Sequence, residues 1–166
     1  MPQPYAPSQD RSTTRRDAVI GTPHKPLIMV VEDHELARKA LAALLSTEGY
    51  EVVEAANGRD ALMSLTTNGP RPDLILLDLM MPVMDGWEFM KRQRHDWRLC
   101  TIPTIVTTGV ASHDPRCLEM PIVRFLPKPY TAEQLMAAIA AECSPQSAPQ
   151  QRLTFLTLSA SHAAPR

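Results

Sequence analysis

Short apolar runs recur along the chain, separated by segments in which apolar residues return at every third or fourth position. The clearest runs are Leu27–Val31 and Leu74–Leu77, which have the length of buried strands and are too short for buried helices. Three further segments are β-rich, although residues 50–55 alternate poorly. The pattern predicts five strands, over residues 27–31, 50–55, 74–78, 103–108 and 122–126.

Amphipathic segments follow these strands and predict helices. From Glu35 to Glu48 the apolar residues recur at intervals of three and four, and Gly49 is placed to end this helix. The Asn57-Gly58 pair alone would suit a hairpin turn. Because the apolar residues after it have helical spacing, we favour Asn57 as the cap of a second helix.

Capping residues and prolines define the remaining helices. Asp85 is placed to cap a third helix that fades near residues 94–97, and Thr131 is placed to cap the last one. Each is followed three positions later by the Glu or Gln of a capping box. Between the fourth and fifth strands, Pro115 suits the first turn of a helix and Pro121 must end it. We therefore expect a fourth helix of only one or two turns.

The alternation of strands and helices indicates a parallel sheet with helices on both faces. The predicted fold class is α/β, a doubly wound five-stranded sheet, in one domain that spans residues 25–143. The flanking segments are rich in Pro, Gln and Ser and lack periodicity. We expect a disordered N-terminal tail over residues 1–24 and a flexible C-terminal tail over residues 144–166.

Charge and cysteine content exclude several classes of protein. The 166 residues carry a formal net charge of -1, so no strong field favours nucleic acid or an anionic membrane. Three cysteines without close pairing form neither a disulfide framework nor a metal-ligand spacing, and they indicate a cytoplasmic protein. The longest apolar runs, about five residues, are far shorter than the roughly 20 of a transmembrane helix. We expect no signal peptide and no membrane insertion.

Polar residues stand where the predicted strands end. Asp78 closes the third strand, Glu32 and Asp33 follow the first, Thr108 closes the fourth and Lys128 follows the fifth. In an open α/β sheet such ends border one crevice. Clustered carboxylates repel one another unless a cation lies among them, and Mg²⁺ binds through carboxylates, phosphate and water. Asp78 is therefore the candidate reactive residue for phosphoryl transfer.

Four motifs resemble the receiver domain of response regulators, the CheY-like module of two-component signalling. In chain order they are Val31-Glu-Asp-His34, Asp78-Leu-Met-Met-Pro-Val-Met-Asp-Gly86, Thr107-Thr-Gly109 and Leu126-Pro-Lys-Pro129. The resemblance covers about residues 27–143. It implies a flavodoxin-like (βα)5 fold with strand order 2-1-3-4-5, and a function in phosphorelay signal transduction.

The resemblance also implies a role for each residue of the crevice. Asp78 would accept a phosphoryl group from a sensor histidine kinase or a histidine phosphotransfer protein. Glu32, Asp33 and Asp78, with the backbone carbonyl of Met80, would hold Mg²⁺. Lys128 would pair with the phosphoryl oxygens, and its bond to the following proline would be cis, an isomer common only before proline.

Two switch residues follow from the same resemblance. Thr108 would move toward the phosphoryl group, and Phe125, three residues before Lys128, would reorient with it. The chain departs from the family pattern here, because Phe125 replaces a frequent tyrosine and Gly109 a usual alanine, and the segment up to Lys128 is slightly short. Thr107 is a near rival of Thr108 by position, and Phe125 also suits ordinary core packing.

We expect a stand-alone receiver that binds a downstream protein, does not bind nucleic acid, and catalyses only its own phosphorylation and dephosphorylation. A phosphorylation-independent adaptor with the same fold is the alternative. The intact acids argue against it, and the unusual fourth helix keeps it open. A third reading is a phosphohydrolase with an aspartyl nucleophile. That chemistry needs a second acid two residues after Asp78, where this chain has Met80.

Overall fold

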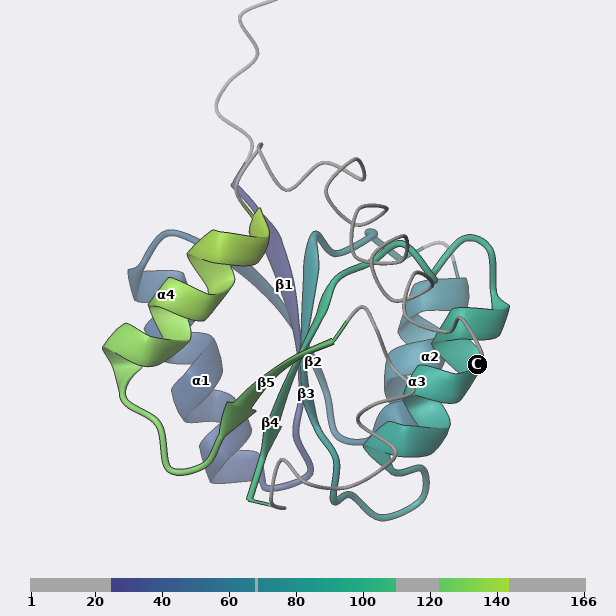
Figure 1. The fold of residues 1–166 in the computed structure, drawn as a ribbon. Helices are drawn as coiled ribbons and strands as arrows, with labels where there is room; N and C mark the ends of the chain where they lie inside the picture. Colours follow the sequence, from purple (N-terminus) through teal and green to yellow (C-terminus); the bar gives the residue numbers. More distant parts are fainter. Residues whose placement is uncertain (1–24, 68, 110–122, 144–166) are drawn as a thin grey trace, which may run out of the picture.

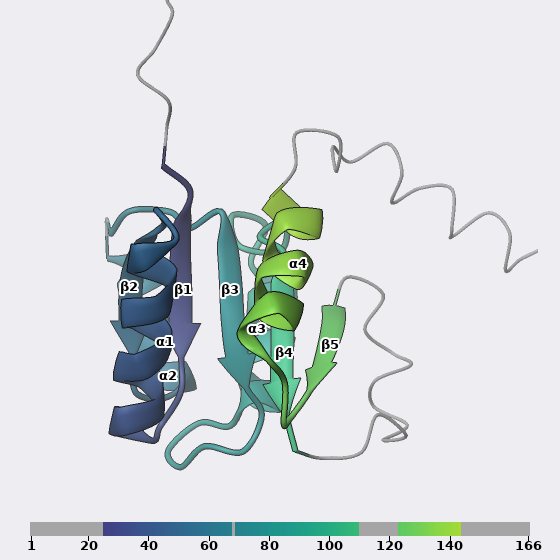
Figure 2. The same ribbon diagram turned by 90° about the vertical axis from the view of Figure 1, so that its left-hand side faces the viewer.

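The computed structural model describes residues 25–67, 69–109 and 123–143. Within them, five parallel strands form one sheet in the order β2-β1-β3-β4-β5, which confirms the predicted α/β fold and strand order. The strands are β1 (Leu27–Val31), β2 (Glu51–Ala55), β3 (Leu74–Asp78), β4 (Thr104–Thr108) and β5 (Val123–Pro127). Figure 2 shows them side by side with their arrows in one direction, so that their carboxyl ends share one edge.

Two described helices cover each face of the sheet. Helices α1 (Glu35–Thr47) and α4 (Ala132–Cys143) lie on one face, and α2 (Gly58–Thr66) and α3 (Gly86–His95) lie on the other (Figure 1). The short helix predicted between Pro115 and Pro121 lies outside the described residues, as do the two predicted tails. No helix in the described part of the chain is both long and apolar enough to cross a membrane.

The central strands are buried on both faces and pack into two cores. In β1, Met29 and Val31 join the core beneath α2 and α3, whereas Ile28 and Val30 join the core beneath α1 and α4. Every residue of β1 and β3 is buried. Such strands have no solvent-facing position along their length, which explains their continuous apolar sequences. Reactive polar groups are therefore confined to the strand ends.

Capping contacts set the boundaries of the first two helices. The Asn57 side-chain oxygen accepts from the N–H groups of Arg59 and Asp60, both at 3.0 Å, so Asn57-Gly58 begins α2 and not a hairpin. Gly49 adopts a φ of 91° and follows Glu48, the C-cap of α1. This left-handed conformation costs glycine little, and it stops the helix where the sequence predicts.

The capping box of α4 is complete, whereas the one predicted for α3 forms only in part. Gln134 Oε1 accepts from the Thr131 N–H at 2.8 Å, and Thr131 Oγ1 accepts from the Gln134 N–H at 3.3 Å. In α3, Asp85 Oδ1 accepts from the Glu88 N–H at 2.8 Å. Glu88, however, pairs with Arg92 one turn along the helix, because a guanidinium four residues away is a charged donor.

Candidate functional site

Three carboxylates meet at the carboxyl edge of the sheet. The β1–β3 register places Val31 beside Leu77, so Glu32 comes level with Asp78. One carboxylate oxygen from each of Glu32, Asp33 and Asp78 lies within 4.8 Å of the other two. Glu32 is 4% exposed and Asp78 8%, whereas Asp33 is exposed. Buried carboxylates this close together require a compensating positive charge.

The ammonium group of Lys128 supplies that charge. Its Nζ donates to Asp78 Oδ2 at 2.6 Å and to Glu32 Oε2 at 2.9 Å. The Lys128 N–H donates to the Thr108 carbonyl at 2.8 Å, which fixes the lysine just beyond β5, and its bond to Pro129 is cis as predicted. Burial acts to lower the pKa of Lys128, but hydrogen bonds to the two carboxylates outweigh it and raise that pKa. The lysine is therefore held in its charged form.

Backbone N–H groups hold other oxygens of the buried acids. The Met80 N–H donates to Asp78 Oδ1 at 3.1 Å, and the His34 N–H donates to Glu32 Oε1 at 3.4 Å. In both cases the donor is two residues after the acid, so each loop folds back over its own strand end. The main chain of Met80 therefore lies beside Asp78, while its side chain is exposed.

Two backbone features fix the loop between Asp78 and α3. A Cβ on Gly86 would lie 2.5 Å from the Asp78 carbonyl oxygen, so only glycine lets α3 begin against this strand end. Val83 has a φ of 71°, and the Met84 N–H donates to the Pro82 carbonyl at 2.8 Å across it. This arrangement is a γ-turn, and it strains a β-branched residue. The sequence motif marks the loop but did not reveal this strain.

Arg38 on α1 is a contributor that sequence reasoning missed. Its Nη1 donates to the Glu32 carbonyl at 2.7 Å and to the Asp33 carbonyl at 3.3 Å, and its Nε lies 3.4 Å from a Glu54 carboxylate oxygen. The arginine thus ties the backbone of two cluster acids to β2. Nothing in its spacing distinguishes it from Lys39, which also pairs with Glu54.

Both threonines at the end of β4 are buried. Thr107 lies opposite Asp78 in the β3–β4 register, and its side chain hydrogen-bonds with Tyr130 in the loop before α4. Burial raises the pKa of Tyr130, although the charge of Lys128 and the bond to Thr107 oppose that rise. Thr108 holds Lys128 through its carbonyl group. Both hydroxyl residues thus lie at the carboxyl edge, and the assignment of the phosphoryl contact to Thr108 stays a prediction.

Phe125 is half-buried in β5. It pairs in register with Val106 and packs against the core beneath α2 and α3. Its packing role is therefore evident, and its role as a switch stays a prediction.

The donor set suits a hard divalent cation. Carboxylate oxygens from two strand ends converge within 4.8 Å, and such oxygens are the ligands that Mg²⁺ prefers. Lys128 contacts only one oxygen each of Asp78 and Glu32, and the exposed Asp33 stands on the solvent side. The arrangement can hold a cation and neutralise the oxygens of a phosphoryl group at Asp78.

Comparisons with known proteins agree with this geometry. A family model described as "Response regulator receiver domain" matches residues 28–140. Among curated proteins, response regulator MprA of Mycobacterium sp. (strain KMS) is 36% identical over 137 residues, which are 79% of this chain and 58% of MprA. Sensor histidine kinase RcsC of Escherichia coli (strain K12) is 32% identical over 127 residues, 76% of this chain and 12% of RcsC. The chain thus spans little more than half of one relative and a small part of the other.

Solved structures show the same likeness. The chemotaxis response regulator CheY4 of Vibrio cholerae superposes with a TM-score of 0.66 at 29% identity, covering 72% of this chain and 99% of that one. The receiver domain of sensor histidine kinase PA1611 from Pseudomonas aeruginosa PAO1 gives a TM-score of 0.65 at 28% identity, covering 72% and 98%. That receiver domain has a magnesium ion coordinated in its active site cleft.

Proposed function

The chain belongs to the response regulator receiver domain family, the phosphorylation-switch module of two-component signalling, and from this premise we propose that Asp78 is its phosphoacceptor. One observation carries the proposal. The buried Asp78 carboxylate ends β3 with Lys128 Nζ 2.6 Å away and two further carboxylates close by. In the proposed step, an oxygen of Asp78 forms a bond to phosphorus while the nitrogen–phosphorus bond of a phosphohistidine breaks.

We propose Mg²⁺ as the cofactor, held by Glu32, Asp33, Asp78 and the backbone carbonyl of Met80. When bound, the ion would neutralise negative charge on the phosphoryl group. The backbone donor at Met80 already orients Asp78 through Oδ1, which leaves Oδ2 on the side of Lys128. Lys128 would exchange its bond with Asp78 Oδ2 for bonds to the phosphoryl oxygens.

The switch would begin with the same anionic group. Thr108 would donate its hydroxyl proton to a phosphoryl oxygen, and Phe125 would follow from its half-buried position in β5. Both changes bias an existing equilibrium between two conformations, because the new anion interacts with Thr108 and Lys128 in only one of them.

Exposed apolar side chains near the carboxyl edge support a protein as phosphodonor. Leu36 stands in the first turn of α1, and Met80 and Val83 lie in the loop after β3; all three are largely exposed. They would contact a sensor histidine kinase or a histidine phosphotransfer protein around the acidic cluster. We propose a cytoplasmic receiver that passes its signal by contact with a downstream protein.

The chemistry would be limited to the receiver's own phosphorylation and dephosphorylation. An aspartyl phosphohydrolase needs a second acid two residues after its nucleophile, and the Met80 side chain cannot transfer a proton. Steady-state release of phosphate from an ester substrate would contradict this limit.

The experiment that tests the proposal is intact-mass spectrometry after incubation with Mg²⁺ and acetyl phosphate. We expect one phosphoryl adduct on the parent chain and none on Asp78→Asn. Asp60→Asn is the matched control, because it removes a carboxylate on α2 that is not part of the cluster, and it should still gain the adduct. An unmodified parent that nevertheless binds Mg²⁺ would contradict the proposal and favour the phosphorylation-independent adaptor.

A further inference from the structure

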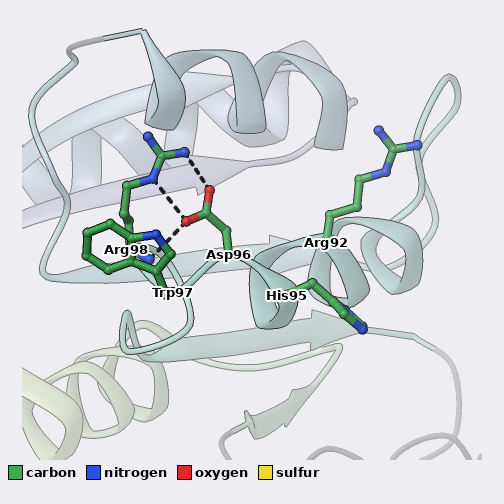
Figure 3. A pocket seen from close by; sticks show the side chains of 5 residues that line it. All are labelled: Arg92, His95, Asp96, Trp97 and Arg98. Atoms are coloured by element: carbon green, nitrogen blue, oxygen red, sulfur yellow. Dashed lines mark hydrogen bonds and ion pairs between the residues drawn. The ribbon is translucent and has the colours of Figure 1, made fainter.

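An exposed tryptophan stands among cationic side chains at the end of α3 remote from Asp78. Trp97 is 82% exposed and lies in the loop that joins α3 to β4. Together with Arg92, His95, Asp96 and Arg98 it lines an open hollow, here called the Trp97 surface (Figure 3). In Figure 3, Asp96 lies between Arg98 and Trp97 on one side and Arg92 and His95 on the other. None of these residues contributes to the carboxylate cluster.

The loop that displays Trp97 is anchored from inside the protein. The buried Gln93 side chain donates to the Ile102 carbonyl at 3.0 Å and to the Leu99 carbonyl at 3.3 Å. Leu99 and Ile102 are themselves buried, and the Leu99 N–H donates to the Asp96 carbonyl at 3.0 Å. The indole therefore stands on an ordered frame, which lowers the entropy lost when a partner binds.

Two arginines of the Trp97 surface are oriented by neighbouring acids. Arg98 donates through Nε and Nη2 to the two carboxylate oxygens of Asp96, at 3.0 and 2.6 Å. Bonds from its side chain and backbone hold the pKa of Asp96 down at about 2, so this pair persists at neutral pH. Arg92 pairs with Glu88 Oε1 through Nε and Nη2.

These pairs leave binding capacity on both guanidiniums. Their bonds employ Nε and Nη2, and no other described residue accepts from Nη1 of Arg92 or Arg98. A guanidinium has five N–H donors, so each arginine can still bind a carboxylate from outside. Both side chains are more than half exposed, at 57% and 53%.

The Trp97 surface is a basic area on an acidic domain. The five residues of this surface include two arginines against one acid, whereas residues 25–143 hold 12 Lys and Arg against 16 Asp and Glu. A local cationic area attracts a short acidic segment, while the surrounding negative charge repels an extended polyanion such as nucleic acid. Tryptophan and arginine are also the side chains that most often dominate the energy of protein interfaces.

We propose that the Trp97 surface docks an acidic segment of a partner protein. An apolar side chain of the segment would pack on the Trp97 indole, and its carboxylates would bind Arg92 and Arg98. This recognition needs only charge and apolar contact, and it uses none of the groups of the phosphoacceptor site. The inference therefore stands independently of the function proposed for Asp78.

The test is a titration of the isotope-labelled full chain with a synthetic peptide of alternating Glu and Leu residues, followed by NMR. The peptide has both features that the surface recognises. We expect saturable shifts of the Trp97 indole N–H and of the backbone N–H groups of residues 92–98, weakened by added salt. Trp97→Ala and Arg98→Ala should each reduce affinity about fivefold or more. Arg59→Ala, which removes the same charge from α2, should not.

Several outcomes would overturn the inference. The first is the lack of saturable shifts, and the second is unchanged affinity in Trp97→Ala and Arg98→Ala with native-like spectra. Binding of an oligothymidylate but not of the peptide would assign the surface to nucleic acid instead. Shifts that depend on protein concentration without peptide would assign it to a second copy of the chain. Asp78→Asn should bind the peptide as the parent does, so failure of either proposal is recognised separately.

Discussion

A single residue, Lys128, balances the negative charge of the carboxylate cluster. Its ammonium group bridges Asp78 and Glu32, and no other side-chain cation among the described residues contacts either carboxylate. Both acids are buried, so their mutual repulsion is poorly screened by solvent. Lysine and a divalent cation would serve the same electrostatic purpose here. A bound Mg²⁺ ion should therefore restore stability that is lost when the lysine is removed.

We predict that Lys128→Met destabilises the protein by about 2 kcal/mol without Mg²⁺, because it leaves two buried carboxylates without their cation. The methionine keeps most of the apolar stem, so the loss reports on charge. Saturating Mg²⁺ should recover most of this stability and raise the melting temperature of the variant more than that of the parent. Thermal unfolding with and without Mg²⁺ measures both effects.

The matched control is Lys39→Met. Lys39 also pairs with a carboxylate, Glu54 at 3.0 Å, but its side chain is 61% exposed. Removal of an exposed pair should cost less than about 0.5 kcal/mol, and Mg²⁺ should not recover it. If Mg²⁺ failed to stabilise Lys128→Met beyond the parent, the shared electrostatic role of lysine and metal ion would be wrong.

Helix α3 links the strand end at Asp78 to the loop before β4. Its first residue, Gly86, presses against the main chain of Asp78, and its last turn carries the buried Gln93 beneath the loop before β4. Gln93 Oε1 accepts from Thr104 Oγ1 at 3.2 Å, and its amide nitrogen donates to two loop carbonyls. A single buried side chain therefore joins α3, the loop and β4.

We predict that Gln93→Leu lowers the free energy of unfolding by about 2–3 kcal/mol. Leucine fills a similar volume, but it leaves two carbonyls and one hydroxyl without their hydrogen-bond partner in the interior. Thr104→Val should cost less, about 1 kcal/mol, because it removes one bond only. Urea unfolding of both variants provides these values.

The double variant Gln93→Leu/Thr104→Val separates this network from simple repacking. Its loss should be smaller than the sum of the single losses, because the Gln93–Thr104 bond is counted in both. Strict additivity would mean that the two side chains are not coupled and that the loss in Gln93→Leu comes from packing.

The elements were largely predictable because each depends on local sequence. Strand burial gives continuous apolar runs, and caps such as Asn57 and Thr131 act within three residues of themselves. The prediction of a capping box failed in part at Glu88, because its carboxylate has two possible hydrogen-bond donors. Its carboxylate binds Arg92 in place of the capping-box N–H, and spacing alone does not rank these two options.

At the scale of the whole molecule, the site follows from topology. Once a parallel sheet is assigned, residues after the strands must meet at one edge, so the convergence of Asp78, Glu32 and Lys128 could be expected. The contacts of Arg38 with the Glu32 carbonyl and with Glu54 could not be expected from the sequence, since they depend on how α1 lies over β2. The strained turn at Val83 could not be expected either, because valine does not favour a positive φ.

Cys143 and Tyr50, which pack against the core beneath α1 and α4, make the stability of the domain depend on alkaline pH. Cys143, at the end of α4, is a free thiol packed against this core, and burial, with the charges of Asp73 and Glu142, raises its pKa from 9.0 to about 11. Burial also raises the pKa of Tyr50, and the charge of Cys143 adds to that rise. In both groups the folded state favours the protonated form.

We predict that the contribution of these groups to the free energy of unfolding is fully present below pH 9 and is lost as the pH rises toward 11. A group whose folded pKa lies above its unfolded value retains protons that the unfolded chain has lost, so rising pH favours unfolding across that window. Urea unfolding between pH 7 and 11 should show this decline, and it should be less steep in Cys143→Ala, whatever that variant loses in packing. Alkylation of Cys143 by iodoacetamide, followed by mass spectrometry, should accelerate up to about pH 11. An equally steep decline in the variant would show that the thiol does not couple to folding, and the alkaline loss would then belong to the other groups.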